Sequence, residues 1–221
     1  MTDQKGPHVS ADTKQPTEQA KPARKTALGP AGTVVDGRIR NLQAGVLANR
    51  SASVAALARL RRGAGKPAGS VGDILEYTLD ERFAPADPTD DAPTVGEKAI
   101  HLAMTLYAVH QQSQGERMHR PGDRFGRAVR ALIPETLDQE KNTHPVLRRF
   151  QALGTAKNLD ELAHHARGVV QLLRAARIPL DYGLLADDLL RWQAPGGASA
   201  VRLRWGRDFF GVPADPDSLT E

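Results

Sequence analysis

Arginine is the residue type whose spacing along this chain suggests chemistry, and that chemistry is phosphate binding. At about 100° of rotation per helical residue, Arg127 and Arg130 fall about 300° and 240° from Arg124. On the same scale, the large apolar residues Phe125, Val129, Leu132 and Ile133 fall between about 80° and 180°. A planar guanidinium binds a phosphate through two hydrogen bonds, and several in a row follow a nucleic-acid backbone. The pattern predicts a helix with one apolar face and one arginine face directed at a phosphodiester backbone.

Further cations stand near the ends of other expected helices or in the loops beside them. They are Arg59, Arg61, Arg62, Lys66, Arg117, His119, Arg120, Arg148, Arg149, Arg202, Arg204 and Arg207. We expect few exposed aromatic side chains beside them, which predicts backbone contacts without base recognition. A general compositional preference for arginine explains the same residues without any partner. The residues alone leave both interpretations open.

The distribution of charge along the chain is uneven, although the total of 30 Lys and Arg against 26 Asp and Glu gives only +4. Residues 31–72 hold seven basic residues and one acid, residues 73–97 hold one basic residue and eight acids, and residues 98–134 hold six basic residues and two acids. Separation of charges by sign is typical of a protein with a charged partner, or of an uneven solvated surface. We expect residues 85–93 to form an exposed acidic loop.

The sequence contains no complete catalytic motif of the kinds compared below. The absence of cysteine excludes thiol catalysis, disulfides and cysteine-based metal sites. Residues 62–67 resemble a phosphate-binding loop, but Leu60 stands where the first glycine is needed and Pro67 where a serine or threonine must bind magnesium. A serine nucleophile elbow and a calcium-loop spacing are also missing. The sequence therefore predicts no enzyme, no cofactor and no metal site.

The histidines show no metal-ligand pattern. Asp160 with His164 and Glu161 with His165 are spaced four apart, which predicts surface ion pairs on one helix. We expect His101 and His110, which belong to an almost wholly apolar helix, to be hydrogen-bonded core residues.

Helical periodicity dominates the chain after residue 32. We expect an all-α single domain, a bundle of about eight to nine helices, because β-type alternation and hairpin signals are absent. The central buried helix is predicted over 95–113, and Ser51 and Asn158 are candidate N-caps. The other helices are predicted from 35 to 46, from 51 to 62, and near 71–79, 123–133, 144–153, 159–177, 181–193 and 199–210.

The two ends of the chain differ from the middle. Residues 1–32 are rich in Pro and Lys and poor in apolar residues, which predicts a disordered tail. We expect the helical domain over 33–212 and a flexible acidic C-terminus over 213–221. No apolar stretch is long enough for a membrane span, and the first 32 residues lack the apolar core of a secretory signal, so we expect a cytoplasmic protein.

Several segments together resemble a known family. They are Leu102–Gln112, Met118–Arg120, Phe125–Val129, Leu147–Leu153, Leu180–Leu189, Arg191–Trp192 and Val201–Phe209. Their order over residues 34–210 is similar to that of CasB, the small subunit of the type I-E CRISPR surveillance complex Cascade, in its actinobacterial form. No single segment is diagnostic, and the resemblance depends on all of them together.

The resemblance implies an all-helical, non-catalytic subunit, present in two copies, whose partners are the other Cascade subunits, the guide RNA and the target DNA. It implies that basic residues hold the strands of the R-loop without reading sequence. The positions that it marks as nucleic-acid-binding are Arg61, Arg62, Lys66, Arg120, Arg124, Arg127, Arg130, Arg148, Arg149 and Arg174. A helical DNA-binding regulator and a protein-only scaffold, with arginines paired to the acidic 80–97 segment of a neighbouring copy, remain the alternatives.

Overall fold

The computed structural model describes residues 27–87, 89–133 and 144–211, and this part of the chain is all α-helical. Two short 3-10 turns, Gly72–Ile74 and Glu81–Phe83, flank α3. The expectation of an all-α fold is confirmed. The α-helices of the described residues are α1 (Pro30–Leu47), α2 (Ser51–Gly63), α3 (Leu75–Thr78), α4 (Val95–Gln111), α5 (Phe125–Arg130), α6 (Pro145–Thr155), α7 (Leu159–Ala176), α8 (Tyr182–Trp192) and α9 (Gly197–Phe210).

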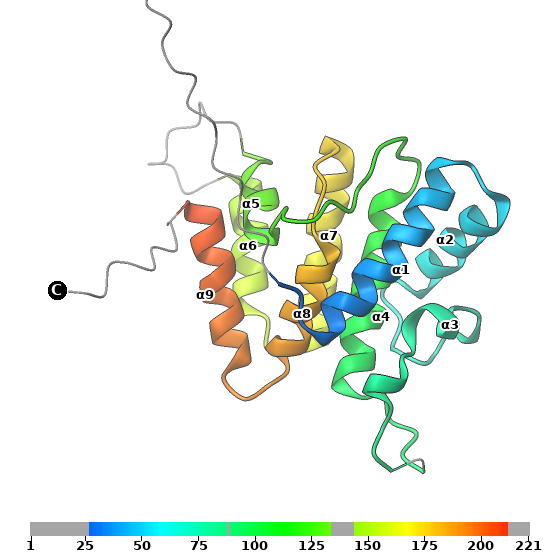
Figure 1. Ribbon diagram of the computed structural model, residues 1–221. Helices are drawn as coiled ribbons and strands as arrows, with labels where there is room; N and C mark the ends of the chain where they lie inside the picture. The colour runs from blue at the N-terminus through cyan, green and yellow to red at the C-terminus, as the bar shows by residue number, and fades with distance from the viewer. Residues whose placement is uncertain (1–26, 88, 134–143, 212–221) are drawn as a thin grey trace, which may run out of the picture.

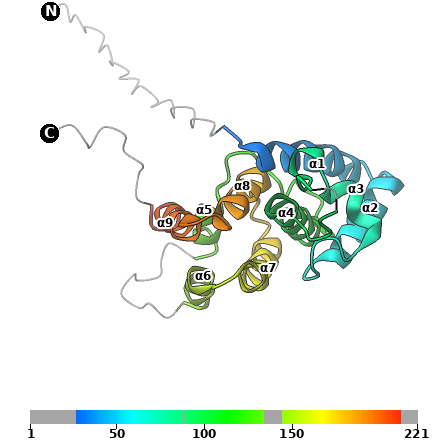
Figure 2. The same cartoon turned by 90° about the horizontal axis from the view of Figure 1, so that it is seen from below.

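The helix α4 lies at the centre of the bundle, as its all-round apolar sequence predicts (Figures 1 and 2). Every residue from Ala99 to Gln111 is buried, because α1, α2, α7 and α8 pack around it. A capping box fixes its start: Thr94 Oγ1 accepts from Glu97 N at 3.2 Å, and Glu97 Oε2 accepts from Thr94 N at 2.8 Å.

The helices α5, α6 and α9 form one end of the bundle, and α2 lies at the opposite end in both views (Figures 1 and 2). Aromatic contacts join this end: Phe150 of α6 stacks on Phe209 of α9 at 4.3 Å between ring centroids, and Phe125 of α5 lies 4.6 Å from Trp205. The α5, α6 and α9 arginines are therefore held on packed helices, far from those of α2.

A buried polar hub centred on His119 connects α1 to the start of α8. Its Nδ1 accepts from Tyr182 N at 3.1 Å, so its Nε2–H donates to Asp36 Oδ1 at 3.0 Å. Gln43 bonds both backbone groups of the same residue. The hub fixes the path of the chain between α4 and α5.

Several predicted boundaries are wrong by a few residues. The first helix begins at Pro30 rather than beyond residue 32, and the N-cap of α2 is Arg50 rather than Ser51. Asn158 is the N-cap of α7, as expected, and its side chain accepts from Glu161 N. Of the tail predicted to be disordered over 1–32, residues 1–26 lie outside the described residues, and residues 30–32 are helical because they form the start of α1. The predicted flexible C-terminus 213–221 also lies outside the described residues.

The largest correction concerns the helix expected over 123–133, of which only Phe125–Arg130 is α-helical. Arg124 has extended backbone angles and is the N-cap. The segment before it is turned by contacts with α8: Gly122 N donates to Asp181 Oδ2 at 2.7 Å, and Asp181 N donates to Asp123 O at 2.7 Å. At the other end, Ile133 precedes Pro134, and the proline ring disfavours helical backbone angles for the residue before it.

Candidate nucleic-acid interface

The end of α2 carries the first group of predicted cations. The helix buries Ala56, Leu57 and Leu60 and leaves Arg61 and Arg62 exposed at its last turn. Arg62 is ion-paired with Asp73 of the following 3-10 turn. Arg61 has no ion pair with any described residue, so its guanidinium remains available for a phosphate.

The glycine loop after α2 is held from two sides. His101 Nε2 bonds the carbonyl oxygen of Lys66 at 3.0 Å, and Arg167 of α7 donates to the carbonyl oxygen of Ala64 at 3.0 Å. The ammonium group of Lys66 is exposed and has no ion pair with a described residue. Sequence reasoning missed Arg167, although its spacing from Asp160 and His164 on the polar face of α7 was a usable signal.

The helix α5 places its arginines differently from the expected face. Arg124 ion-pairs with Asp208 of α9 at 3.6 Å, and Arg130 donates to the carbonyl oxygen of Ile133 at 3.0 Å. Arg127 is exposed and has no ion pair within the described ranges. Burial raises the pKa of Asp208, while the charges of Arg124, Arg127 and Arg204 lower it, so three guanidinium groups lie around one carboxylate.

The helix α6 presents two adjacent arginines. Its apolar face, Val146, Phe150 and Leu153, is buried, and Arg148 and Arg149 lie on the exposed side of its first half. Neither forms an ion pair with a residue that the structure describes. Because α6 is anchored through Phe150, these two cations are displayed from a rigid element.

Two of the predicted cations have internal structural roles. Arg120 is ion-paired with Asp123 in the segment before α5. Arg174 Nε donates to the carbonyl oxygen of Gln112 at 3.0 Å, which closes the end of α4 against α7. A phosphate would compete with these partners.

The structure therefore divides the ten predicted positions into two sets, and it places α2 at the opposite end of the bundle from α5 and α6, so their cations do not share one continuous face (Figure 2). The exposed cations of this group that lack an ion pair among the described residues, here called the open cations, are Arg61, Lys66, Arg127, Arg148 and Arg149. The cations with an internal partner, here called the tied cations, are Arg62, Arg120, Arg124, Arg130 and Arg174.

The buried histidines form no catalytic arrangement. His110 Nδ1 bonds Tyr182 Oη at 2.9 Å, and burial lowers the pKa of His110 to about 4, so this histidine is neutral near pH 7. The pair of His119 and Asp36 resembles a general-base dyad, but the His119 side chain is fully buried and its other nitrogen bonds a backbone amide. The expectation that His101 and His110 are hydrogen-bonded core residues is confirmed.

Within residues 27–87, 89–133 and 144–211, no three metal-ligating side chains gather into a group. Of the two ion pairs expected on α7, His165 and Glu161 form one, with 3.8 Å between Nε2 and Oε1, whereas His164 forms none with Asp160. Among the described helices, none is long and apolar enough to cross a membrane.

Comparison with known proteins identifies relatives over most of the chain. Residues 56–210 match the family described as CRISPR-associated protein Cse2. A curated relative, the CRISPR-associated protein Cse2 of Thermus thermophilus, is 28% identical over 171 residues, covering 77% of this chain and 88% of that protein. The crystal structure of CasB from Thermobifida fusca is 44% identical, with a TM-score of 0.70, over 83% of this chain and 99% of that one.

A more distant structure has the same fold. A chain of a CRISPR RNA-guided surveillance complex matches with a TM-score of 0.59 at 19% identity, over 82% of this chain and 96% of that one. At this identity the likeness concerns the fold alone.

Proposed function

Because the chain belongs to the Cse2 family of CRISPR-associated proteins, also called CasB, we propose that it is a non-catalytic subunit of a type I-E surveillance complex, Cascade. Its task there is to hold the guide RNA and the target and displaced DNA strands of the R-loop through backbone contacts. The proposal includes the other Cascade subunits as partners, two copies of this chain in the complex, and a cytoplasmic location.

The observation that carries the nucleic-acid part is the set of open cations. An exposed arginine without an internal ion pair can donate two hydrogen bonds to one phosphate, and it breaks no ion pair in doing so. Arg127, Arg148 and Arg149 stand on α5 and α6, whose positions are set by aromatic packing on α9. Preorganised cations of this kind suit a phosphodiester backbone.

The mechanism follows from the energetics of strand exchange. The RNA–DNA duplex formed in an R-loop is about as stable as the DNA duplex that it replaces, so a few protein–backbone contacts decide the balance. Base pairing with the guide recognises the sequence, whereas the open cations stabilise the separated strands. A subunit of this kind binds strands weakly and without sequence preference.

The test is affinity for RNA and single-stranded DNA oligonucleotides of several sequences, measured by fluorescence anisotropy over a range of salt concentrations. Each lost phosphate contact to a single strand lowers the slope of log affinity against log salt by about 0.7. We expect Arg127→Gln and Arg148→Gln each to lower the slope by about that amount, equally for all sequences.

The matched control is Arg120→Gln, because Arg120 is exposed but ion-paired with Asp123. We expect this variant to change the slope least. An unchanged slope in the Arg127→Gln/Arg148→Gln double variant would refute the backbone-binding role. A strong preference for one duplex sequence would favour a DNA-binding regulator, and failure to co-purify with guide RNA and other Cascade subunits would refute membership of the complex.

A further inference from the structure

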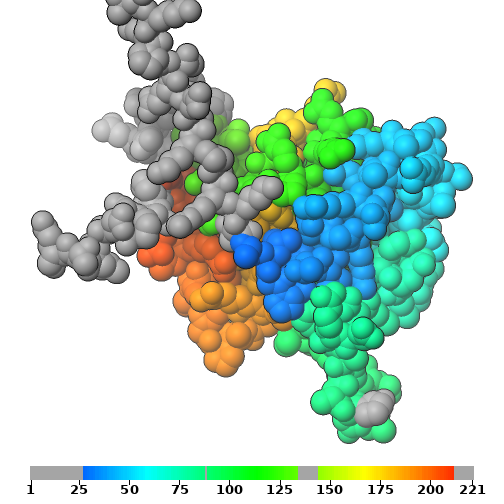
Figure 3. All heavy atoms as spheres, viewed as in Figure 1, coloured from blue at the N-terminus to red at the C-terminus, as the bar shows by residue number. Residues whose placement is uncertain are grey.

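A groove lies between α3, the start of α4, the acidic loop that joins them, and Ala68 and Gly69 of the loop that also carries Lys66; it is far from the open cations of α5 and α6. It has a volume of about 390 Å³, at the small end of the range of about 300–1,000 Å³ typical of ligand pockets. Leu75, Leu79, Pro85 and Pro93 line it, and Leu79 is 43% exposed. The loop projects from the body of the molecule (Figure 3). The groove is thus an open apolar surface that fits a few side chains.

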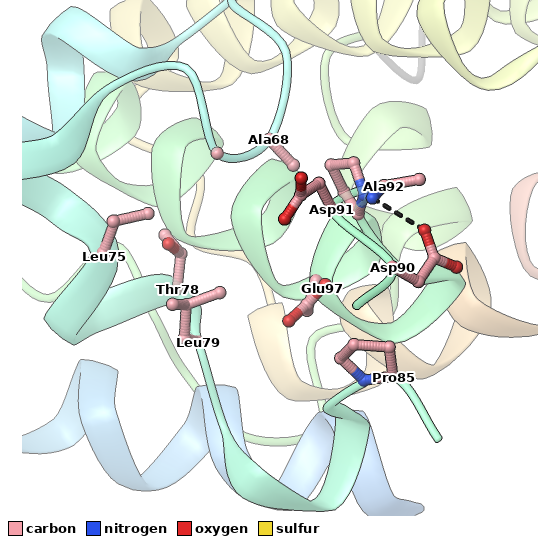
Figure 4. A pocket seen from close by; sticks show the side chains of 11 residues that line it. Ala68, Leu75, Thr78, Leu79, Pro85, Asp90, Asp91, Ala92 and Glu97 are labelled. Carbon is pink, nitrogen blue, oxygen red and sulfur yellow. Dashed lines mark hydrogen bonds between the residues drawn. The ribbon is translucent and has the colours of Figure 1, made fainter. Parts of the chain in front are cut away.

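Carboxylates surround this apolar surface. In Figure 4, the carboxylates of Asp91 and Glu97 point across the groove toward Thr78 and Leu79, while Asp90 turns away and bonds Ala92 N. Glu97 caps its own helix with one oxygen, at 2.8 Å from Thr94 N. The groove therefore favours an occupant that combines small apolar groups with positive charge.

The acidic block of residues 73–97 is only partly neutralised inside the protein. Its first members are paired: Asp73 with Arg62, Glu76 with Arg59, and Asp80 with Arg38 and Arg82. The later members have no ion pair to any described residue, and they are Glu81, Asp87, Asp90, Asp91 and Glu97. These unpaired carboxylates repel nucleic acid, so the surface suits a cationic polypeptide rather than a nucleic acid.

The chain itself contains such a polypeptide directly before its first helix. Residues 19–26, with Lys21, Arg24 and Lys25, carry three cations and no acid, and Pro22 and Ala23 supply small apolar groups. We propose that the basic segment Lys21–Lys25 docks in the acidic groove of the same chain. Docking brings three positive charges to a groove lined by three of the unpaired carboxylates, Asp90, Asp91 and Glu97, and covers the exposed Leu79.

The distance is compatible with docking within one chain. The chain enters the described structure beside α8, where Gly29 N donates to Asp187 Oδ2 at 2.6 Å. Gln193, six residues or about 9 Å further along α8, donates to the carbonyl oxygen of Val95 at 2.9 Å. Val95 is two residues before Glu97 in the groove. The basic segment precedes Gly29 by four to eight residues, which extend to about 14–28 Å.

Each ion pair between the basic segment and the groove is weak, but the short chain that joins the segment to α1 favours the contact. An exposed ion pair contributes about 0.2–1 kcal/mol, and a short tether supplies an effective concentration on the order of millimolar. The docked population therefore depends strongly on salt, because ions screen exposed charges beyond about 10 Å at 0.1 M and about 3 Å at 1 M.

The absence of cysteine makes a site-specific test possible. In the full chain, Ala23→Cys carries a nitroxide spin label, and paramagnetic broadening is measured at the backbone amides of the ¹⁵N-labelled protein. At low salt we expect broadening at Asp91, Ala92 and Glu97, and loss of this broadening at 1 M salt. No preferential broadening at these amides would overturn the proposal.

Two further measurements test whether the segment comes from the same chain and whether the groove carboxylates hold it. In a mixture of spin-labelled unenriched chain with unlabelled ¹⁵N chain, broadening of the groove would place the segment on a second copy and overturn docking within one chain. The variant Asp91→Asn/Glu97→Gln should lose the broadening, and Gln at position 97 keeps the helix cap. The matched control Glu116→Gln/Asp160→Asn, at two exposed carboxylates elsewhere, should retain it; equal loss in both would overturn a role for the groove.

Discussion

Asp188 on α8 should make the stability of this protein fall as the pH rises. Its carboxylate is buried; Trp205 Nε1–H donates to its Oδ2 at 2.6 Å, and Arg204 lies 2.9 Å from its Oδ1. Burial raises the pKa of Asp188 from 3.8 to about 6, although Arg204 and Trp205 act in the opposite direction. The folded protein therefore holds this proton more tightly than the unfolded chain does.

The magnitude follows from the linkage between proton binding and folding. At 1.36 kcal/mol per pH unit, a pKa of about 6 against 3.8 corresponds to about 3 kcal/mol in total. This stabilisation is fully present below pH 3.8 and is lost as the pH rises through about 6. Between pH 4.5 and pH 8, about 2 kcal/mol of it should disappear, since part is already lost at pH 4.5.

The variant Asp188→Asn removes the titration while keeping an oxygen acceptor for Trp205. We expect the free energy of unfolding of Asp188→Asn, minus that of the wild type, to increase by about 2 kcal/mol between pH 4.5 and pH 8. Urea denaturation at a series of pH values measures this difference, and a carboxyl NMR titration reports the pKa directly.

The control is Asp87→Asn, an exposed position where hydrogen bonds from Thr89 lower the pKa of the carboxyl. Its stabilisation is present above pH 3.8 and is lost only at lower pH, so its difference from the wild type should stay constant from pH 4.5 to pH 8. Parallel curves for Asp188→Asn and the wild type would refute the reasoning, because they would mean that burial does not favour the protonated carboxyl.

Three further predictions concern single positions. Burial lowers the pKa of His110 from 6.5 to about 4, so the stability that the neutral histidine gives the folded protein is lost as the pH falls. Between pH 8 and pH 4.5, the free energy of unfolding of His110→Asn should therefore fall by about 2–3 kcal/mol less than that of the wild type in the same denaturation assay. Gly126→Ala should lower the melting temperature at a cost of about 1–3 kcal/mol or more, because the new Cβ overlaps the carbonyl oxygen of Trp205; Gly206→Ala in α9, which meets nothing within 4 Å, should not lower it. Asp187→Ala should lower the free energy of unfolding by about 1–3 kcal/mol and speed hydrogen exchange at the start of α1, because the Asp187 carboxylate accepts hydrogen bonds from the amides of Gly29 and Gly32. Unchanged exchange at these amides would contradict this role.

Local patterns predicted the helices well because helix formation depends on neighbours three and four residues apart. The almost wholly apolar run over 99–109 required a helix that is buried on all sides, and α4 is that helix. Asn158 capped α7 as expected, since a cap needs only the third amide after it. The helix over 123–133 was predicted too long, because the contacts of Gly122 and Asp123 with Asp181 come from a distant part of the chain.

In the candidate interface, the sequence determines the charges, and the packing of the helices determines the partners of the arginines. The sequence by itself determined that arginines are abundant over residues 31–72 and 98–134, and that acids are concentrated between these two segments. Only the tertiary structure decided that two of the tied cations have remote partners: Arg124 meets Asp208, and Arg174 meets Gln112. A guanidinium reaches several ångströms from its backbone, so its partner depends on how helices pack and not on its own helix face. The same packing placed the open cations at two ends of the bundle, which no helical angle along one segment can reveal.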